Sequence, residues 1–346
     1  MKKYVFLLTA LLVFVNVFSQ VVLTYKNNAP LLGDTIITQG IELIEPGNPG
    51  ANQVWDFSKI QLTGESNVSF LSGEPLKPIA GLSDFDATLS EKGYEYFYKM
   101  DQYSSSIVGL NIKDLSVVFS DPVVKMKYPV YYGTGFKDEF SGTGTDKFDS
   151  GIGLSGNYSF KADAYGTLML HDRIIKGVLR LKTEEKKIQV NPCGIYESLI
   201  TSYYWYAPQA RYPVLGLSTR EVKTNGKEPV VTTSAYMNRK MANTGLRTAG
   251  SEDDGLNEDE VSLVLYPNPF VGKLTYNYFL HKQFPVTIEL VDMTGKTVIT
   301  MTSEEVQSEG FHTGELDAVK HDLKMGVYYF RIKCGDRATV SKVVKM

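Results

Sequence analysis

Residues able to act as nucleophiles or metal ligands are scarce in this chain. It contains four His and two Cys in 346 residues, and His171 is the only His before residue 243. No His-Glu-x-x-His pair and no three-His zinc site can therefore be built in the larger, first part of the chain. His171 with Asp172, or with Cys193, could belong to a catalytic set, but polar turn residues and a buried Cys give the same pattern. We therefore expect no catalytic residue, no metal site and no cofactor.

Carboxylates are the remaining candidates for chemistry. Asp84 and Asp86 lie two residues apart and would share one face of an extended strand. A second group lies in a Gly-rich stretch and comprises Asp138, Glu139, Asp146 and Asp149. A secreted glycoside hydrolase would need two carboxyls about 5 to 10 Å apart across a cleft. Solvated turn residues or a bound hard cation explain the same side chains, so the hydrolase is the alternative hypothesis.

The feature that most favours binding is a run of aromatic residues, Tyr203, Tyr204, Trp205 and Tyr206. Successive residues of a strand point to opposite faces, so a strand here would place two rings on each face. One face could pack in a core while the other offers flat rings to a sugar or a protein, because Tyr and Trp combine apolar area with a polar tip. The alternative is that all four rings are core, since buried sheets need such residues regardless of a ligand.

Short alternating runs, separated by turns, must position these residues. The 22 Tyr and 17 Phe favour half-buried strands, and residues 177–183 alternate apolar and charged side chains. Asn225-Gly226 stands between two strand-like runs and predicts a tight hairpin, because both turn positions need a positive φ. We therefore predict an all-β protein whose first module, residues 20–242, is a sandwich or a barrel-like antiparallel sheet.

The beginning of the chain has the pattern of a secretory leader. Lys2 and Lys3 precede an apolar run over residues 4–15, and the stretch ends at Ser19. The alternative is a membrane anchor, but the run is shorter than the roughly 20 residues that span a bilayer. We therefore predict a signal peptide over residues 1–19 and export from the cytoplasm. No Cys follows the expected cut, so a lipid anchor on Cys is not expected.

Residues 243–262 form an acidic stretch with few large apolar side chains. Such a segment cannot bury enough surface to offset its ordering entropy, which predicts a flexible linker. A calcium loop is the alternative, because Asp253, Asn257 and Asp259 lie at alternating offsets, but the twelve-residue ligand pattern is not met.

The formal net charge of the chain is -3, which gives no basic footprint for a nucleic-acid partner.

From residue 263 to 346 the strand pattern returns, and its length suits a small two-sheet sandwich of immunoglobulin-like architecture. Four motifs stand out in this part: the turn of Pro267, Asn268 and Pro269; the turn that contains Gly295; Gly326 with Tyr328; and, at the end of the chain, Lys342 with Lys345. In order and spacing they resemble the C-terminal sorting domain of the type IX secretion system. The alternative is a small accessory β-sandwich without that role.

The resemblance implies an exported β-rich cargo of Bacteroidota type. It implies Sec export, an outer-membrane translocon that reads the domain, a sorting-domain peptidase that cuts near the linker, and a cargo that is released or attached to surface lipopolysaccharide. The protein would then be secreted or lie on the cell surface. We expect the cargo to be a non-catalytic module for adhesion, glycan or protein binding, or envelope structure; a secreted hydrolase with paired carboxylates is the alternative.

Overall fold

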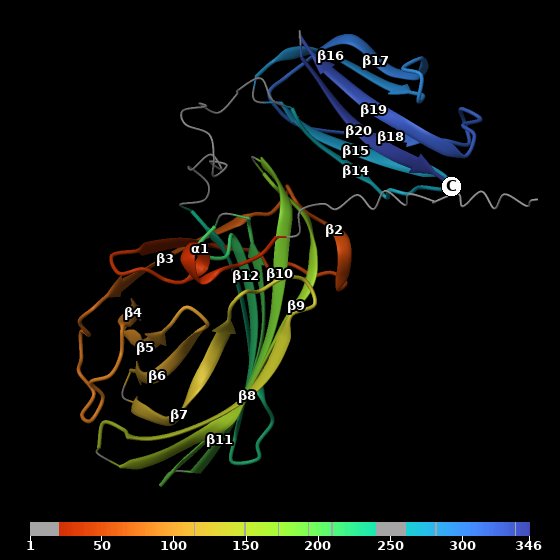
Figure 1. Cartoon of the computed structure of the whole chain (residues 1–346). Coiled ribbons are helices and arrows are strands. Elements are labelled where there is room, and N and C mark those ends of the chain that lie inside the picture. The colour runs from red at the N-terminus through yellow and green to blue at the C-terminus, as the bar shows by residue number, and fades with distance from the viewer. Residues whose placement is uncertain are drawn as a thin grey trace, which may run out of the picture.

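The computed structural model describes residues 21–239 and 261–346, except positions 114, 149, 172, 193, 209, 281 and 336. The predicted signal peptide and all but the last two residues of the predicted linker lie outside this description. So do Asp149, Asp172 and Cys193. Apart from one short helix, the regular elements of the described residues are all strands, as the sequence predicted, and they form two parts (Figure 1).

The larger part is a barrel-like sheet of twelve antiparallel strands. Its neighbours follow the order β10-β11-β12-β13-β1-β3-β4-β5-β6-β7-β8-β9, and β9 pairs again with β10, which closes the ring. A thirteenth strand, β2 (Gly50–Phe57), pairs parallel with the second half of β9. The twelve strands are β1 (Thr35–Ile41), β3 (Leu62–Ser72), β4 (Ala87–Glu91), β5 (Tyr94–Met100), β6 (Ser104–Ile112), β7 (Leu115–Lys127), β8 (Gly135–Thr145), β9 (Gly151–Leu170), β10 (Arg173–Asn191), β11 (Gly194–Tyr206), β12 (Leu215–Thr224) and β13 (Val230–Asn238).

Alternation along the strands divides the apolar residues of this barrel between two cores. Leu179 and Leu181 of β10 point inward and pack with Phe160 of β9 and residues of β5 to β8. Trp205 of β11 points outward and joins a second core with Trp55 of β2. The second core exists because the segment from Ile41 to Ile60 covers the outside of β9 to β13. The outer face of this wall is therefore buried as well.

The first described residues close one end of the barrel. Leu23 exchanges backbone hydrogen bonds of 2.8 and 2.9 Å with Val130, and the short helix α1 (Tyr25–Asn28) follows. Asn28 is buried, and its Nδ2 donates to the carbonyl of Ala210 at 2.7 Å. Within the described ranges, no helix combines the length and apolar character needed to cross a lipid bilayer.

The smaller part is a sandwich of two sheets, as predicted. One sheet has the order β14-β15-β18 and the other β17-β16-β19-β20. Their apolar faces enclose a core that includes Leu274, Phe330 and Val343 and no residue of the barrel. The strands are β14 (Ser262–Tyr266), β15 (Lys273–Leu280), β16 (Phe284–Val291), β17 (Thr297–Gln307), β18 (Gly310–Asp317), β19 (Gly326–Cys334) and β20 (Arg337–Lys345).

Candidate functional site

The motifs of the smaller part come together at one end of the sandwich. Asn268 joins the Pro267–Pro269 turn to the last strand, since its Nδ2 donates to the carbonyl of Lys342 and its Oδ1 accepts from the amide of Val344, both at 2.9 Å. In the β19–β20 ladder Gly326 lies opposite Lys345, and Tyr328 lies opposite Val343.

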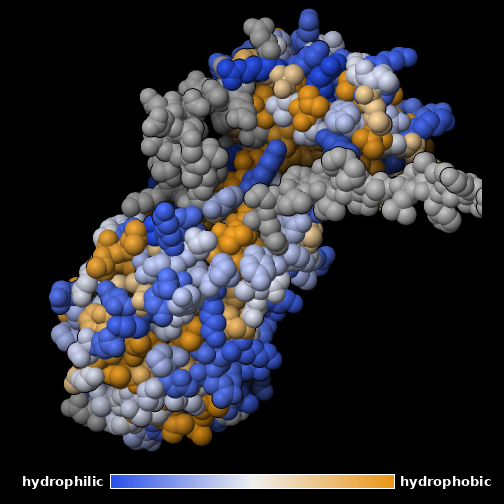
Figure 2. Space-filling view, in the orientation of Figure 1, coloured by the Kyte–Doolittle hydropathy of each residue, from blue (hydrophilic) through white to orange (hydrophobic). Residues whose placement is uncertain are grey.

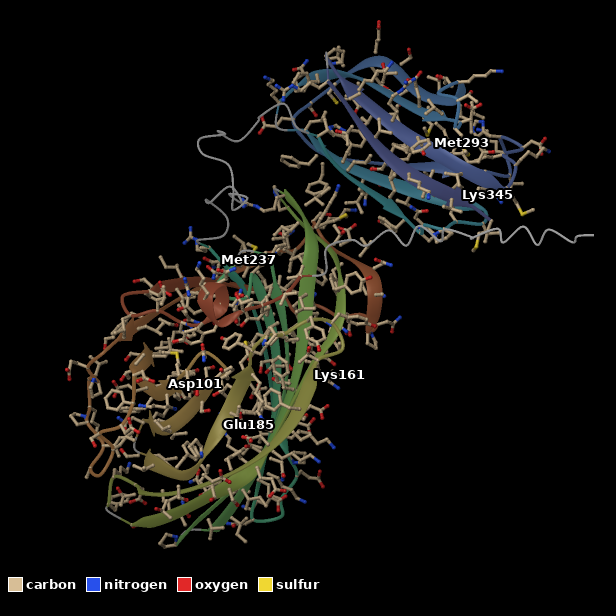
Figure 3. The ribbon with its side chains drawn as sticks, viewed as in Figure 1. Asp101, Lys161, Glu185, Met237, Met293 and Lys345 are labelled. Carbon is tan, nitrogen blue, oxygen red and sulfur yellow. The ribbon has the colours of Figure 1, made fainter. Side chains whose placement is uncertain are left out.

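The remaining motif residue, Gly295, lies in the turn between β16 and β17 with φ of 84°, a conformation that favours glycine. Met293 of this turn and Lys345 lie at the same end of the sandwich (Figure 3). Residues up to 79 positions apart in the chain, from Pro267 to Met346, thus form one surface.

The aromatic run lies on β11 and divides between the two faces of the barrel wall. Trp205 has no exposed surface and packs edge-on against Trp55 and Phe57, with ring centroids 6.1 and 5.9 Å away. Tyr203, on the same outer face, is partly covered. Tyr204 and Tyr206 point inward and pack against the inner core. The outer pair is therefore largely core, and any rings offered to a ligand are those of the inner pair.

Tyr204 and Tyr206 belong to a larger group of inward-facing tyrosines, here called the tyrosine cluster. Its members are Tyr96 and Tyr98 of β5, Tyr158 of β9, Tyr204 and Tyr206 of β11, and Tyr236 of β13. Gly216 of β12 makes room for one of them, because a Cβ at this position would lie 2.5 Å from the ring of Tyr236. Burial raises the pKa of Tyr158 to about 12 and also raises the pKa of Tyr98 and Tyr206.

The hydroxyls of the tyrosine cluster are largely without protein partners. Tyr158 donates to the carbonyl of Lys125 at 3.3 Å. Among the residues that the structure describes, the hydroxyls of Tyr98, Tyr204, Tyr206 and Tyr236 have no hydrogen-bond partner, yet all four side chains keep some accessible surface. None of these four hydroxyls is fully buried, so each can exchange hydrogen bonds with water or with a ligand inside the barrel.

Charged side chains complete this inner site. Glu185 of β10, labelled in Figure 3, lies 2.8 Å from Nζ of Lys125 and 3.0 Å from Nζ of Lys187. Lys125 also lies over the ring of Tyr158, 4.0 Å from its centroid. Lys125 is 27% exposed and Glu185 is 16% exposed, so both remain accessible. Two cations face this anion, and the register places a second carboxylate, Glu91, on the same inner face as Tyr96.

The ionisation of Glu185 makes the stability of the fold depend on pH. Burial raises the pKa, but Lys125 and Lys187 outweigh burial and hold it at about 2, against the usual 4.5. The folded chain therefore binds this proton less readily than the unfolded chain. The ion pairs stabilise the fold fully above pH 4.5, and their contribution, roughly 3 kcal/mol, is lost as the pH falls toward 2.

We therefore expect Glu185→Gln to flatten the pH dependence of stability. The free energy of unfolding in urea, measured from pH 7 to pH 2.5, should fall by about 3 kcal/mol more in the wild-type chain than in the variant. The variant should be the less stable of the two at pH 7, because Lys125 and Lys187 lose their shared partner. Parallel curves for the two proteins would contradict this account.

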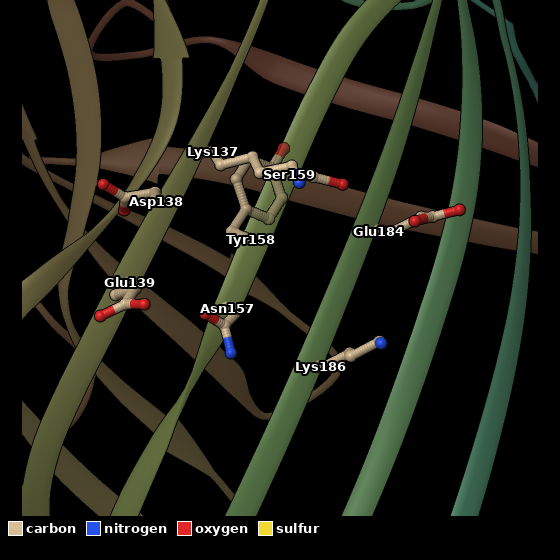
Figure 4. Close-up of a pocket in the computed structure, with 8 residues that line it drawn as sticks. All are labelled: Lys137, Asp138, Glu139, Asn157, Tyr158, Ser159, Glu184 and Lys186. Carbon is tan, nitrogen blue, oxygen red and sulfur yellow. The ribbon is translucent and has the colours of Figure 1, made fainter.

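A second candidate site lies on the outside of the same wall, where a depression of about 470 Å³ crosses β8, β9 and β10 (Figure 4). The register places its residues in two rows: Glu139, Asn157 and Lys186, and Lys137, Ser159 and Glu184. Each row thus has an acid and a base on either side of a small polar residue, in opposite order. Such a surface can hydrogen-bond a polar ligand, and it can equally be a solvated face.

The carboxylates predicted from sequence do not gather at one site. Asp84 and Asp86 form exposed ion pairs with Lys99. Asp146 accepts from the amides of Phe148 and Ser150, which lower its pKa. Asp138 and Glu139 both border the outer depression, but Asp138 lies opposite the inward-facing Tyr158 and accepts from the amide of Val124 at 2.8 Å. Glu139 therefore shares the outer face with Glu184, which the sequence did not indicate because it lies on a strand 45 residues later.

Metal ligands and nucleophiles form no group in the described ranges. No three His, Cys, Asp or Glu side chains there are placed to hold a metal ion. Cys334 is a free thiol buried in the sandwich core, and burial raises its pKa to about 11. It is therefore a poor nucleophile at neutral pH.

Comparison with known proteins bears on the smaller part only. Residues 264–346 match the family model of a secretion system C-terminal sorting domain. The match begins within β14 and runs to the last residue, so it covers both sheets and all four motifs. Searches of the curated proteins and of the solved structures find no match to the chain.

Proposed function

We propose that this chain, which carries a type IX secretion sorting domain over residues 264–346 and is thereby a secreted or cell-surface cargo, is a non-catalytic module that binds an acidic glycan inside its barrel. The observation that carries the proposal is the set of four inward hydroxyls without protein partners beside Lys125, Glu185 and Lys187. A barrel built only for stability would fill this space with apolar side chains.

The chemistry of the inner site fits a sugar with a negative group. Tyrosine rings offer flat apolar area to the faces of a sugar ring, and their hydroxyls can exchange hydrogen bonds with sugar hydroxyls. The ammonium groups of Lys125 and Lys187 would bind a carboxylate or a sulfate through charge-assisted hydrogen bonds. An acidic glycan supplies both kinds of group.

The register also supports an entrance to this site. Ile200, Arg220 and Thr232 lie opposite one another on β11, β12 and β13, in the inward-facing series of Tyr204. Arg220 and Thr232 are nonetheless exposed, so the barrel is open to solvent near this end. The N-terminal segment with α1 closes the other end. A ligand would therefore enter past Arg220, whose charge adds to the attraction of an anion.

The test is a screen of the purified full chain on a glycan array that holds acidic and neutral glycans, followed by calorimetry with the best acidic glycan. Lys187→Ala should weaken binding roughly tenfold, because it removes one charge-assisted contact. Tyr204→Phe should weaken it severalfold without a loss of stability, since its hydroxyl has no protein partner.

Matched controls lie next to each of these residues on the outer face. Lys186→Ala and Tyr203→Phe should leave the affinity unchanged. An array without any acidic glycan bound would overturn the proposal. So would Lys186→Ala weakening binding as much as Lys187→Ala, because that result would place the ligand in the outer depression.

The outer depression favours a second function, a secreted hydrolase. Glu139 and Glu184 lie two strands and two residues apart, or about 12 Å between backbones by the usual spacings, so their side chains would have to lean toward each other to reach the roughly 6.5 to 9.5 Å of an inverting glycosidase. Turnover of a glycan by the full chain that is lost in both Glu139→Gln and Glu184→Gln would establish this function instead.

The route to the surface is part of the proposal. A leader at residues 1–19 would direct the chain through Sec, the translocon would read the sorting domain, and a peptidase would then cut the segment between the two parts. The cargo would be released or joined to surface lipopolysaccharide. The sorting motifs support the recognition step, because Asn268, Gly326 and Lys345 lie together at one end of the sandwich.

A further inference from the structure

The outer face of the β14–β15–β18 sheet is buried although it does not face the sandwich core. In β15, Leu274, Tyr276, Tyr278 and Leu280 point into the core, so Asn277 and Phe279 point away from it. Val264 of β14 lies opposite Asn277. All three outward side chains are nevertheless buried. An isolated sandwich would expose them to water, so something outside the sandwich covers them.

The cover is the end of the barrel wall. Strand β10 contacts both β14 and β15, and Nδ2 of Asn277 lies 3.4 Å from Sδ of Met169 in β9. Met169 itself is only 1% exposed. The ends of β9 and β10 reach toward this sheet in Figure 1, and Figure 2 shows apolar residues gathered where the two parts meet.

The residues at this contact allow the barrel and the sandwich to separate. Val264, Phe279 and Met169 supply apolar area, which favours association. Asn277 lies among them, and its Nδ2 donates to the hydroxyl of Tyr266 at 3.0 Å, but its Oδ1 is buried without a partner. An unsatisfied buried acceptor costs about 1 to 3 kcal/mol and would regain its hydrogen bonds in water. The contact therefore holds the two parts together less firmly than a core would.

We propose that this face of the sorting domain is a docking surface for the barrel of the same chain, and that docking leaves the four-stranded sheet with its motif residues free for the secretion machinery. The docked face lies on the three-stranded sheet, whereas Gly326, Tyr328 and Lys345 lie on the four-stranded sheet. Docking and recognition thus use different surfaces of one small domain. Release of the cargo then needs this contact to open in addition to a cut in the connecting segment.

Methionine oxidation of the full chain by dilute hydrogen peroxide tests the docking. Met169 should be oxidised at least tenfold more slowly than Met293, which is 74% exposed and serves as an internal standard. Phe279→Glu should undock the domain and bring the oxidation rate of Met169 close to that of Met293. Asn277→Leu should slow it further, because it removes the unsatisfied oxygen and adds apolar contact.

Two controls separate undocking from unfolding. Val298→Glu places the same charge on an exposed position of β17 and should leave Met169 protected. The Cys334 thiol, buried in the sandwich core, should stay unreactive toward a thiol reagent in every variant. If Phe279→Glu exposes Cys334, Asn277→Asp takes its place as the undocking variant. Wild-type oxidation of Met169 as fast as that of Met293, or no increase in a folded undocking variant, would overturn the proposal.

Discussion

A chain that ends before residue 263 is expected to remain in the periplasm, whereas the full chain reaches the cell surface or the medium. Residues 264–346 are the sorting domain, and the barrel has its own two cores, to which this domain contributes no residue. The truncated chain should therefore fold and lose its export signal together. Fractionation of cells that produce each form, with detection by an antibody against the barrel, measures the difference.

A milder variant of the same experiment tests the motif surface. Asn268→Ala removes the two 2.9 Å hydrogen bonds that hold the Pro267–Pro269 turn on β20, and we expect it to reduce surface delivery severalfold. Lys320→Ala, a change of an exposed residue elsewhere in the domain, is the control. Arrival of the truncated chain at the surface in normal amounts would refute the role of the sorting domain in this protein.

Arg180→Met is expected to destabilise the barrel by about 3 to 5 kcal/mol, because it leaves the charge of Asp163 buried without its partner. The guanidinium is fully buried and binds Asp163 through Nε and Nη2, both at 2.9 Å. It also donates to the carbonyls of Pro46, Gly47 and Asn48. The ring centroids of Trp55, Tyr203 and Trp205 lie 5.2 to 5.9 Å from its central carbon. Arg180 thus holds the covering segment, residues 41–60, against the outer face of the barrel wall.

Urea unfolding of Arg180→Met, of Arg180→Lys and of the control Lys182→Ala checks this expectation. Arg180→Lys should recover only part of the loss, since an ammonium cannot make the paired contacts of the guanidinium fork. Lys182→Ala, which removes the exposed ion pair with Glu184 two residues along the same face, should cost less than about 1 kcal/mol. A loss for Arg180→Met as small as that for Lys182→Ala would show that Arg180 does not hold the covering segment.

The sequence by itself determined the all-β class of the fold and the presence of a sorting domain. Alternation of apolar and polar residues is set by neighbours in the chain, so the strands and the Asn225-Gly226 turn could be predicted; both turn residues have positive φ, at 48° and 72°. The sorting motifs could be read because each is a short run of residues in a family pattern. The family model over residues 264–346 confirms that reading.

The tertiary structure alone decided which side of each strand is the inside. The sequence left a sandwich and a barrel open, and the β9–β10 pairing closed the ring. The sequence predicted that Tyr203 to Tyr206 alternate between two faces, but not which face lies inside the barrel. Tyr204 joins the inner site and Trp205 is covered, because the segment from Ile41 to Ile60 lies over the outer face.

The reason is the distance along the chain between partners. Lys125 and Glu185 are 60 residues apart, and Arg180 and Pro46 are 134 apart. Local patterns specify whether a residue is in a strand and which neighbours share its face. They carry no information on which distant segment will cover that face, because burial depends on the closure of the whole sheet and on what packs against it.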